Sequence, residues 1–176
     1  MFVRSVAALA AICLVGFAPI AQAADKPTDP EIAHIAYTAS VIDIEAAKLA
    51  IAKSKTKAVV DFANGMVRDH EAVNVQALDL VKKLGVTPED NDISKSLAAD
   101  AQKKHDELAK LEGDAFDKAY IDNEVAYHKA VISAVEGLLI PEAEHAELKA
   151  LLQNVVPALQ AHLDHAEMVQ SQLNEK

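Results

Sequence analysis

The stretch that decides the fold is Asp61–Leu84, with the sequence DFANGMVRDHEAVNVQALDLVKKL. Apolar residues recur at every third or fourth position, which is the spacing of one face of an α-helix. This face comprises Val59, Ala63, Met66, His70, Val73, Ala77, Leu80 and Leu84. His70 therefore occupies a position that is expected to face the protein core, where an imidazole ring needs a polar partner.

Three further long segments show the same helical period. The first is expected to run from Asp29, as N-cap, to about Lys53, and the others cover about 114–139 and 144–173. On the first segment the predicted core face is Ile32, Ile35, Ala39, Ile42, Ala46 and Leu49. Glu45 lies on the shoulder of that face. Pro157 lies inside the last segment and is expected to kink it.

A weaker amphipathic segment, 94–111, separates the second and third long helices. It follows Gly85 and Pro88, which are expected to end the helix before it. We expect this short helix to carry the chain across one end of a bundle. No run of alternating apolar residues predicts a strand. The predicted fold is all-α, an up-and-down four-helix bundle with one extra short connecting helix.

The N-terminal residues have the pattern of a secretory signal peptide. Arg4 is followed by an apolar run, and Ala21-Gln22-Ala23 matches a cleavage motif. We therefore expect residues 1–24 to be removed and residues 25–176 to form one soluble, periplasmic or otherwise exported domain without a transmembrane segment. Cys13 is the only cysteine, so the exported domain would contain neither disulfides nor thiolate ligands. The net charge of −10 argues against nucleic acid as a partner and is compatible with cations.

Histidines interrupt the apolar faces of three long helices, at His70, His128 and His162. A single histidine of this kind usually bonds a carbonyl or carboxylate in the core. Burying three imidazoles without partners would cost a few kcal/mol each, on the order of the penalty for any unpaired polar group. A shared metal ion would satisfy one nitrogen of each ring. Counted from the connecting turns, the three lie within roughly 10 Å of one another along the bundle axis.

The predicted site is therefore one transition-metal ion, zinc, copper or iron, held by His70, His128 and His162. Glu45 is expected to be the fourth ligand or a carboxylate that holds one of the ligands by a hydrogen bond. The sequence leaves open whether Glu124, His165, Asp69 and Met66 join the site. Two Glu-x-x-His pairs, Glu31 with His34 and Glu142 with His145, lie at helix starts. They do not supply the four glutamates of a di-iron carboxylate centre.

Several motifs together resemble a large bacterial family of exported ferritin-like proteins of unknown function, often labelled as outer membrane proteins. These motifs are IEAAKLA at 44–50, FANGMVRDH at 62–70, FDKAY at 116–120, HKAV at 128–131 and VPALQAHL at 156–163. The resemblance implies a ferritin-like four-helix fold. It matches the family's polar positions at Glu45, Asp69, His70, His128 and His162, but not at Glu124. The family label implies no activity.

The functional hypothesis is an exported metal-binding bundle that uses core histidines, in envelope metal or stress handling. The alternative is a structural or interaction module of the bacterial envelope whose histidines bind no metal. Neither a Ser-His-Asp set nor a phosphate-binding loop is apparent, so an enzyme is not favoured. The sequence does not indicate a protein partner.

Overall fold

The computed structural model describes residues 26–175, which are almost entirely helical and contain no strand. The elements are α1 (Asp29–Lys53), α2 (Lys57–Leu84), α3 (Asp92–Ala109), α4 (Gly113–Ala134), the π-helical turn η1 (Val135–Leu139), α5 (Ile140–Glu142) and α6 (Ala146–Asn174). The all-helical prediction is confirmed for this part of the chain. The expected signal peptide lies outside the described residues. None of the described helices is long and apolar enough to cross a membrane.

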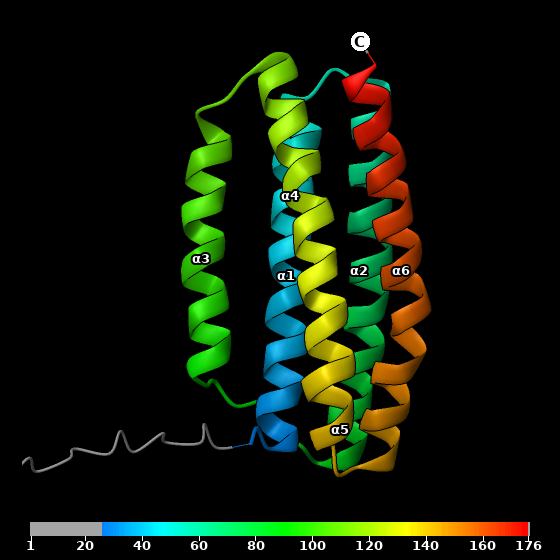
Figure 1. Cartoon of the computed structure of the whole chain (residues 1–176). Coiled ribbons are helices and arrows are strands. Elements are labelled where there is room, and N and C mark those ends of the chain that lie inside the picture. Colours follow the sequence, from blue (N-terminus) through cyan, green and yellow to red (C-terminus); the bar gives the residue numbers. More distant parts are fainter. Residues whose placement is uncertain (1–25, 176) are drawn as a thin grey trace, which may run out of the picture.

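The long helices α1, α2, α4 and α6 lie side by side, and α3 lies outside them against α1 (Figure 1). The expectation that the segment after α2 crosses one end of the bundle is wrong. Instead, the 18 residues of α3 run along the length of α1. This helix returns the chain to the end where α2 began, so α2 and α4 run in the same direction (Figure 1). The order of directions therefore differs from the simple up-and-down order expected from the sequence.

Helix α1 begins as the sequence predicts, but its cap is Thr28 rather than Asp29. Glu31 accepts hydrogen bonds from the Thr28 backbone N–H at 2.8 Å and from its hydroxyl at 3.0 Å. This leaves the buried Asp29 carboxylate free to accept the backbone N–H groups of Glu144, at 2.9 Å, and His145, at 2.8 Å. Asp29 thereby joins the start of α1 to the connection between α5 and α6.

The helix ends follow local chemistry that can be read from the sequence. Gly85 terminates α2 with φ of 67°, a left-handed conformation that glycine adopts without a steric penalty. Pro157 lies within α6, which continues to Asn174. Only three residues, 54–56, separate α1 from α2, so these helices pack as an antiparallel pair.

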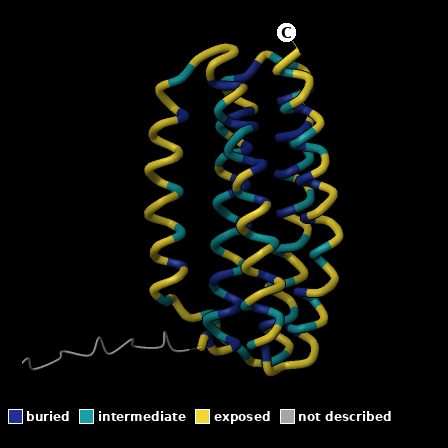
Figure 2. The backbone as a smooth tube through the Cα atoms, in the orientation of Figure 1, coloured by how far each residue is buried: buried dark blue, intermediate teal, exposed yellow. Residues whose placement is uncertain are grey.

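Buried positions lie on the sides of the long helices that face one another (Figure 2). The buried apolar residues form two clusters. At the end where α2 begins, Phe62, Phe116 and Tyr120 are fully buried. At the opposite end the core is aliphatic and includes Leu139 and Leu152. Burying each such side chain stabilises the fold by about 1.5–3 kcal/mol. This packing supports the polar side chains that lie between the two clusters.

Candidate metal centre

The three histidines predicted from the sequence meet in the core. His70 comes from α2, His128 from α4 and His162 from α6, and all three are buried. Their ring centroids are 6.2 Å apart for His70 and His128, 5.3 Å for His70 and His162, and 5.6 Å for His128 and His162. One nitrogen of each ring lies within 4.8 Å of the other two. The sequence-based expectation that these residues share one depth thus agrees with the geometry.

Glu45 does not lie with the histidines. Its side chain is exposed and lines a cleft between α1 and α3. The α1 carboxylate in the core belongs to Asp43, whose exposed fraction is 1%. Asp43 Oδ2 lies 3.2 Å from His70 Nε2 and 3.4 Å from His128 Nε2. Two residues along a helix turn the side chain by about 200°, so Glu45 points to the opposite side.

The predicted face of α1 is buried in the core at Ile32 and Ile35, but beside the histidines it turns towards α3. Ile42, Ala46 and Leu49, which looked like core positions, line the cleft beneath α3. The face that meets the histidines carries the buried Ser40 and Asp43 instead. A helix covered on two sides needs two apolar faces, and the more apolar one need not face the centre of the bundle. The sequence does contain a weaker helical pattern that includes Asp43. This residue lies seven positions before Ala50, and therefore on the same face of α1.

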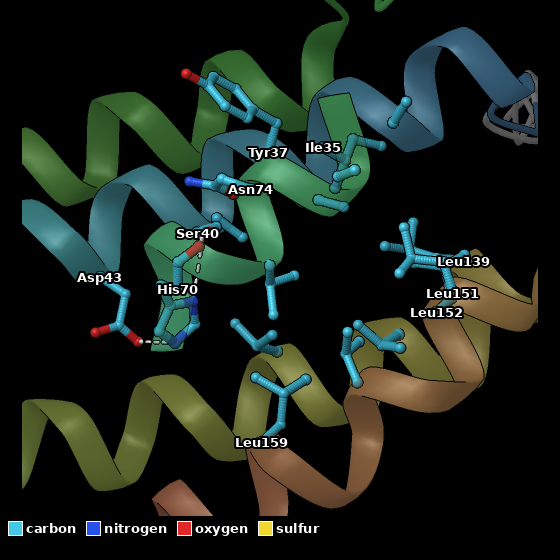
Figure 3. A pocket seen from close by; sticks show the side chains of 18 of the residues that line it. Ile35, Tyr37, Ser40, Asp43, His70, Asn74, Leu139, Leu151, Leu152 and Leu159 are labelled. Carbon is cyan, nitrogen blue, oxygen red and sulfur yellow. Dashed lines mark hydrogen bonds and ion pairs between the residues drawn. The ribbon is translucent and has the colours of Figure 1, made fainter. Parts of the chain in front are cut away.

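Each histidine has one ring nitrogen held by a hydrogen bond. The Nδ1 atom of His128 is 3.0 Å from the carbonyl oxygen of Glu124, and that of His70 is 3.2 Å from the hydroxyl of Ser40 (Figure 3). In His162 the bonded atom is Nε2, which is 3.2 Å from Asp69 Oδ2. Because carbonyl and carboxylate oxygens only accept, we assign the N–H proton of His128 to Nδ1 and that of His162 to Nε2.

The other nitrogen of every ring has no hydrogen-bond partner. These buried atoms are Nε2 of His70, Nε2 of His128 and Nδ1 of His162, and both oxygens of Asp43 are also without one. The short approaches of Asp43 to two imidazoles therefore lack hydrogen-bond alignment. Histidine ligands of metal ions typically have this arrangement, in which one nitrogen is held by a polar group and the other is free to bind.

Glu124 adds a second carboxylate at the same depth. It lies one turn before His128, is fully buried, and neither of its oxygens has a hydrogen-bond partner. Burial, together with the nearby Asp43 carboxylate, raises the pKa of Glu124 well above its usual range. Asp43, Glu124 and His128 form a second group whose potential ligand atoms lie within 4.8 Å of one another. The sequence left Glu124 open, and the structure places it beside the cluster.

The electrostatics favour neutral imidazoles. Burial lowers the pKa of His128, and it also lowers the pKa of His162 despite the opposing hydrogen bond to Asp69. The pKa of Asp69 is itself lowered, mainly by its bonds with the Arg68 guanidinium. Neutral imidazole is the form that binds metal ions through a nitrogen lone pair.

The remaining residues left open by the sequence lie elsewhere. His165 packs edge-on against Phe62, with ring centroids 5.2 Å apart. Met66 is buried in the apolar cluster around Phe62. Among the described residues, His165 belongs to no group of potential ligands. Asp69 contacts the Nε2 atom of His162, and its half-buried side chain lies between that ring and Arg68.

The spacing around Asp43 Oδ2 fits a cation of the predicted type. Tetrahedral ligands at 2.0–2.1 Å from zinc lie about 3.3–3.4 Å from one another. The distances from Asp43 Oδ2 to the two imidazole nitrogens, 3.2 and 3.4 Å, are close to that value. The three imidazoles form one group of potential ligands, and Asp43, Glu124 and His128 form another. One ion bound to the three imidazoles and Asp43 together would therefore draw these side chains closer to one another.

Comparison with known proteins identifies the family. Residues 17–169 match the model of a family described as "Domain of unknown function (DUF4142)". The chain belongs to this family. No curated protein and no solved structure matched it. The DUF4142 match covers both carboxylates and all three histidines of the cluster, but its description names no ligand or activity, so function has to be argued from the site.

Proposed function

We propose that this DUF4142 chain is an exported, ferritin-like metal-binding bundle that holds one transition-metal ion through His70, His128, His162 and Asp43. The observation that carries the proposal is the set of unpaired buried atoms, one nitrogen from each histidine and both oxygens of Asp43. Leaving such atoms unpaired costs about 1–3 kcal/mol each, more for a charged group. A bound cation would compensate all of them together.

The ligand set favours zinc, copper or iron. Three imidazoles and one carboxylate supply nitrogen and oxygen donors, and the residues of the described part contain no cysteine. Glu124 is a further possible oxygen ligand, because a cation would offset the cost of ionising its carboxyl group. Glu45, which the sequence suggested, is replaced by Asp43 in this proposal.

The proposed location of the protein is the periplasm, and its acidic composition is compatible with cations. A leader at residues 1–24 would deliver the domain to the periplasm, where it would take part in envelope metal or stress handling. The arrangement of four long helices supports a ferritin-like fold. The site has too few carboxylates for di-iron chemistry, so we favour binding over catalysis.

Calorimetric titration of chelator-treated protein with Zn²⁺, Cu²⁺ and, without oxygen, Fe²⁺ tests the proposal. We expect about one equivalent of at least one ion to bind. The double variant His70→Ala, His162→Ala should lose this binding, whereas His34→Ala, His105→Ala should retain it, because His34 and His105 lie outside the cluster. Equal affinity of the two double variants would refute the assignment.

One observation favours the alternative of a structural or interaction module without metal. Asp43 Oδ2 lies near two imidazoles at once, so protonation of either ring would create a buried ion pair. In that case the melting temperature should be the same with chelator and with each metal ion. A rise of several degrees on adding one equivalent of metal would contradict this alternative.

A further inference from the structure

A cavity occupies the bundle between the histidines and the end where α1 begins. Its volume is about 480 Å³, and all four long helices contribute to its wall. Figure 3 shows aliphatic side chains from the α1–α2 pair and from the α4–α6 pair facing one another across it. Protein interiors are normally packed as densely as organic crystals, and the volume lies within the range of small-molecule sites. This space is therefore large enough for a ligand.

Small side chains and a helix irregularity create the space. Alanines occupy several positions of the cavity wall, namely Ala33, Ala36, Ala77, Ala134 and Ala158. The π-helical turn η1 also faces the cavity, through Val135 and Leu139. Such turns occur frequently at functional sites. The void thus follows from the residue sizes on four helices and from the altered helix path.

The cavity has an apolar rim. Leu78 of α2 is 50% exposed and Tyr37 of α1 is 39% exposed, yet both line the cavity. Large exposed apolar residues that continue into an interior space provide a path for an apolar molecule. His34, Asn74 and Asp69 also line the cavity, and the Asp69 carboxylate is paired with Arg68.

The inner end of the cavity is polar. His70, His162 and Asp43 all line it, and each is more than nine-tenths buried. In the tautomer assigned above, the unpaired Nδ1 atom of His162 can only accept, as can the oxygens of the Asp43 carboxylate. The unpaired Nε2 atom of His70 also accepts when the ring proton lies on Nδ1 and the Ser40 hydroxyl accepts it. A ligand group that donates a hydrogen bond would match them. A carboxylate would instead meet the Asp43 carboxylate without donating.

We propose that the cavity binds an uncharged single-chain amphiphile, whose aliphatic chain lies among the leucines and valines and whose hydroxyl group donates to the histidine–aspartate cluster. An uncharged head group avoids the large cost of moving an ion into an apolar interior. The acceptor atoms are the ones proposed above to hold the metal ion, so the hydroxyl group and the ion exclude each other there, and the amphiphile is expected to bind the metal-free protein.

Displacement of a fluorescent probe tests the proposal on chelator-treated full-length domain. The neutral dye N-phenyl-1-naphthylamine should bind with a saturable rise in fluorescence, and the chain has no tryptophan to obscure it. 1-Decanol should displace the dye at least tenfold more effectively than its methyl ether, which has the same chain but no donor. Decanoate should also be at least tenfold weaker than 1-decanol at neutral pH.

Two filling variants and one control locate the binding site. Ala77→Phe and Ala36→Phe should each lower the affinity for 1-decanol at least tenfold, because either ring would occupy the cavity. Ala99→Phe, on the exposed side of α3, should leave it unchanged. Circular dichroism would show which filling variants are folded, and Ala77→Leu provides a milder substitution if a phenylalanine variant unfolds.

The outcomes separate this proposal from the metal site. Absence of saturable dye binding, or equal affinities in the cavity variants and Ala99→Phe, would overturn the cavity assignment. Equal displacement by 1-decanol and its methyl ether would overturn the placement of the hydroxyl. Neither result would affect metal titration, and a failed metal titration would leave the dye experiment valid.

Discussion

Asp43 Oδ2 in α1 lies 3.4 Å from Nε2 of His128 in α4, and neither atom has an aligned hydrogen-bond partner. Both side chains have an exposed fraction of 1%. Two acceptor atoms this close in a dry interior repel each other unless a proton or a cation lies between them. Changing Asp43 and measuring metal binding is therefore the most direct test of the proposed site.

Asp43→Asn and Glu45→Gln form a matched pair of charge-removing substitutions on one helix. We expect Asp43→Asn to weaken Zn²⁺ binding about 10–100-fold, as for loss of a ligand or its partner. Glu45→Gln should leave the affinity unchanged, because this side chain is exposed on the α3 side of α1. Isothermal titration calorimetry measures both constants, and a larger effect of Glu45→Gln would restore the residue suggested by the sequence.

Glu124→Gln should stabilise the metal-free protein, and more so at higher pH. The folded-state pKa of Glu124 is raised by burial and by Asp43, so the wild type loses stability as pH rises above the unfolded value of 4.5. We expect the variant to melt several degrees higher than the wild type at pH 8. About 1 kcal/mol corresponds to roughly 2–4 °C in a domain of this size.

The gap in melting temperature between Glu124→Gln and the wild type should shrink towards pH 4, where the carboxyl group is protonated in both states. Glu136→Gln, at an exposed position of η1, is the control. A gap of the same size at pH 4 and pH 8 would show that packing, rather than ionisation, causes the difference.

Asp29→Asn should remove a pH-dependent contribution to folding stability. Its sign is opposite to that of Glu124, because ionised Asp29 stabilises the fold. Burial alone would raise the pKa of Asp29, but hydrogen bonds from Glu144 and His145 outweigh it and lower the pKa. The stabilisation is thus fully present above the unfolded value of 3.8 and is lost as pH falls through the folded-state pKa. The two proteins should differ by about 1–2 kcal/mol at pH 7 and converge in acid. Urea unfolding at pH 7 and pH 3 measures this, and a constant difference would contradict it.

Phe62→Ala should lower the free energy of unfolding by about 3–5 kcal/mol, because it leaves a cavity among fully buried aromatic rings. Val75→Ala, at a side chain that is 60% exposed, should change it by less than about 0.5 kcal/mol. Chemical denaturation of both variants gives the comparison. Similar losses would show that the aromatic end of the bundle contributes less than its burial indicates.

The success of the sequence analysis at the histidines and its failure at Glu45 have the same origin. On α2 and α6 the histidines interrupt the predicted apolar face, so that face identifies their direction. On α1 two faces are covered, one by α3 and one by the bundle, and periodicity alone could not distinguish them. The predicted apolar stripe enters the core at Ile32 and Ile35 but lines the cleft beneath α3 at Ile42, so Asp43 on the neighbouring face was overlooked.

The amino-acid sequence by itself determined the helices and the histidines on three inner faces, because these depend on local spacing and backbone chemistry. Only the tertiary structure decided that α3 lies along α1, that Asp43 rather than Glu45 meets the histidines, and that a cavity reaches them. These features depend on which helices become neighbours and on how side chains of different sizes from separate helices fill the shared space.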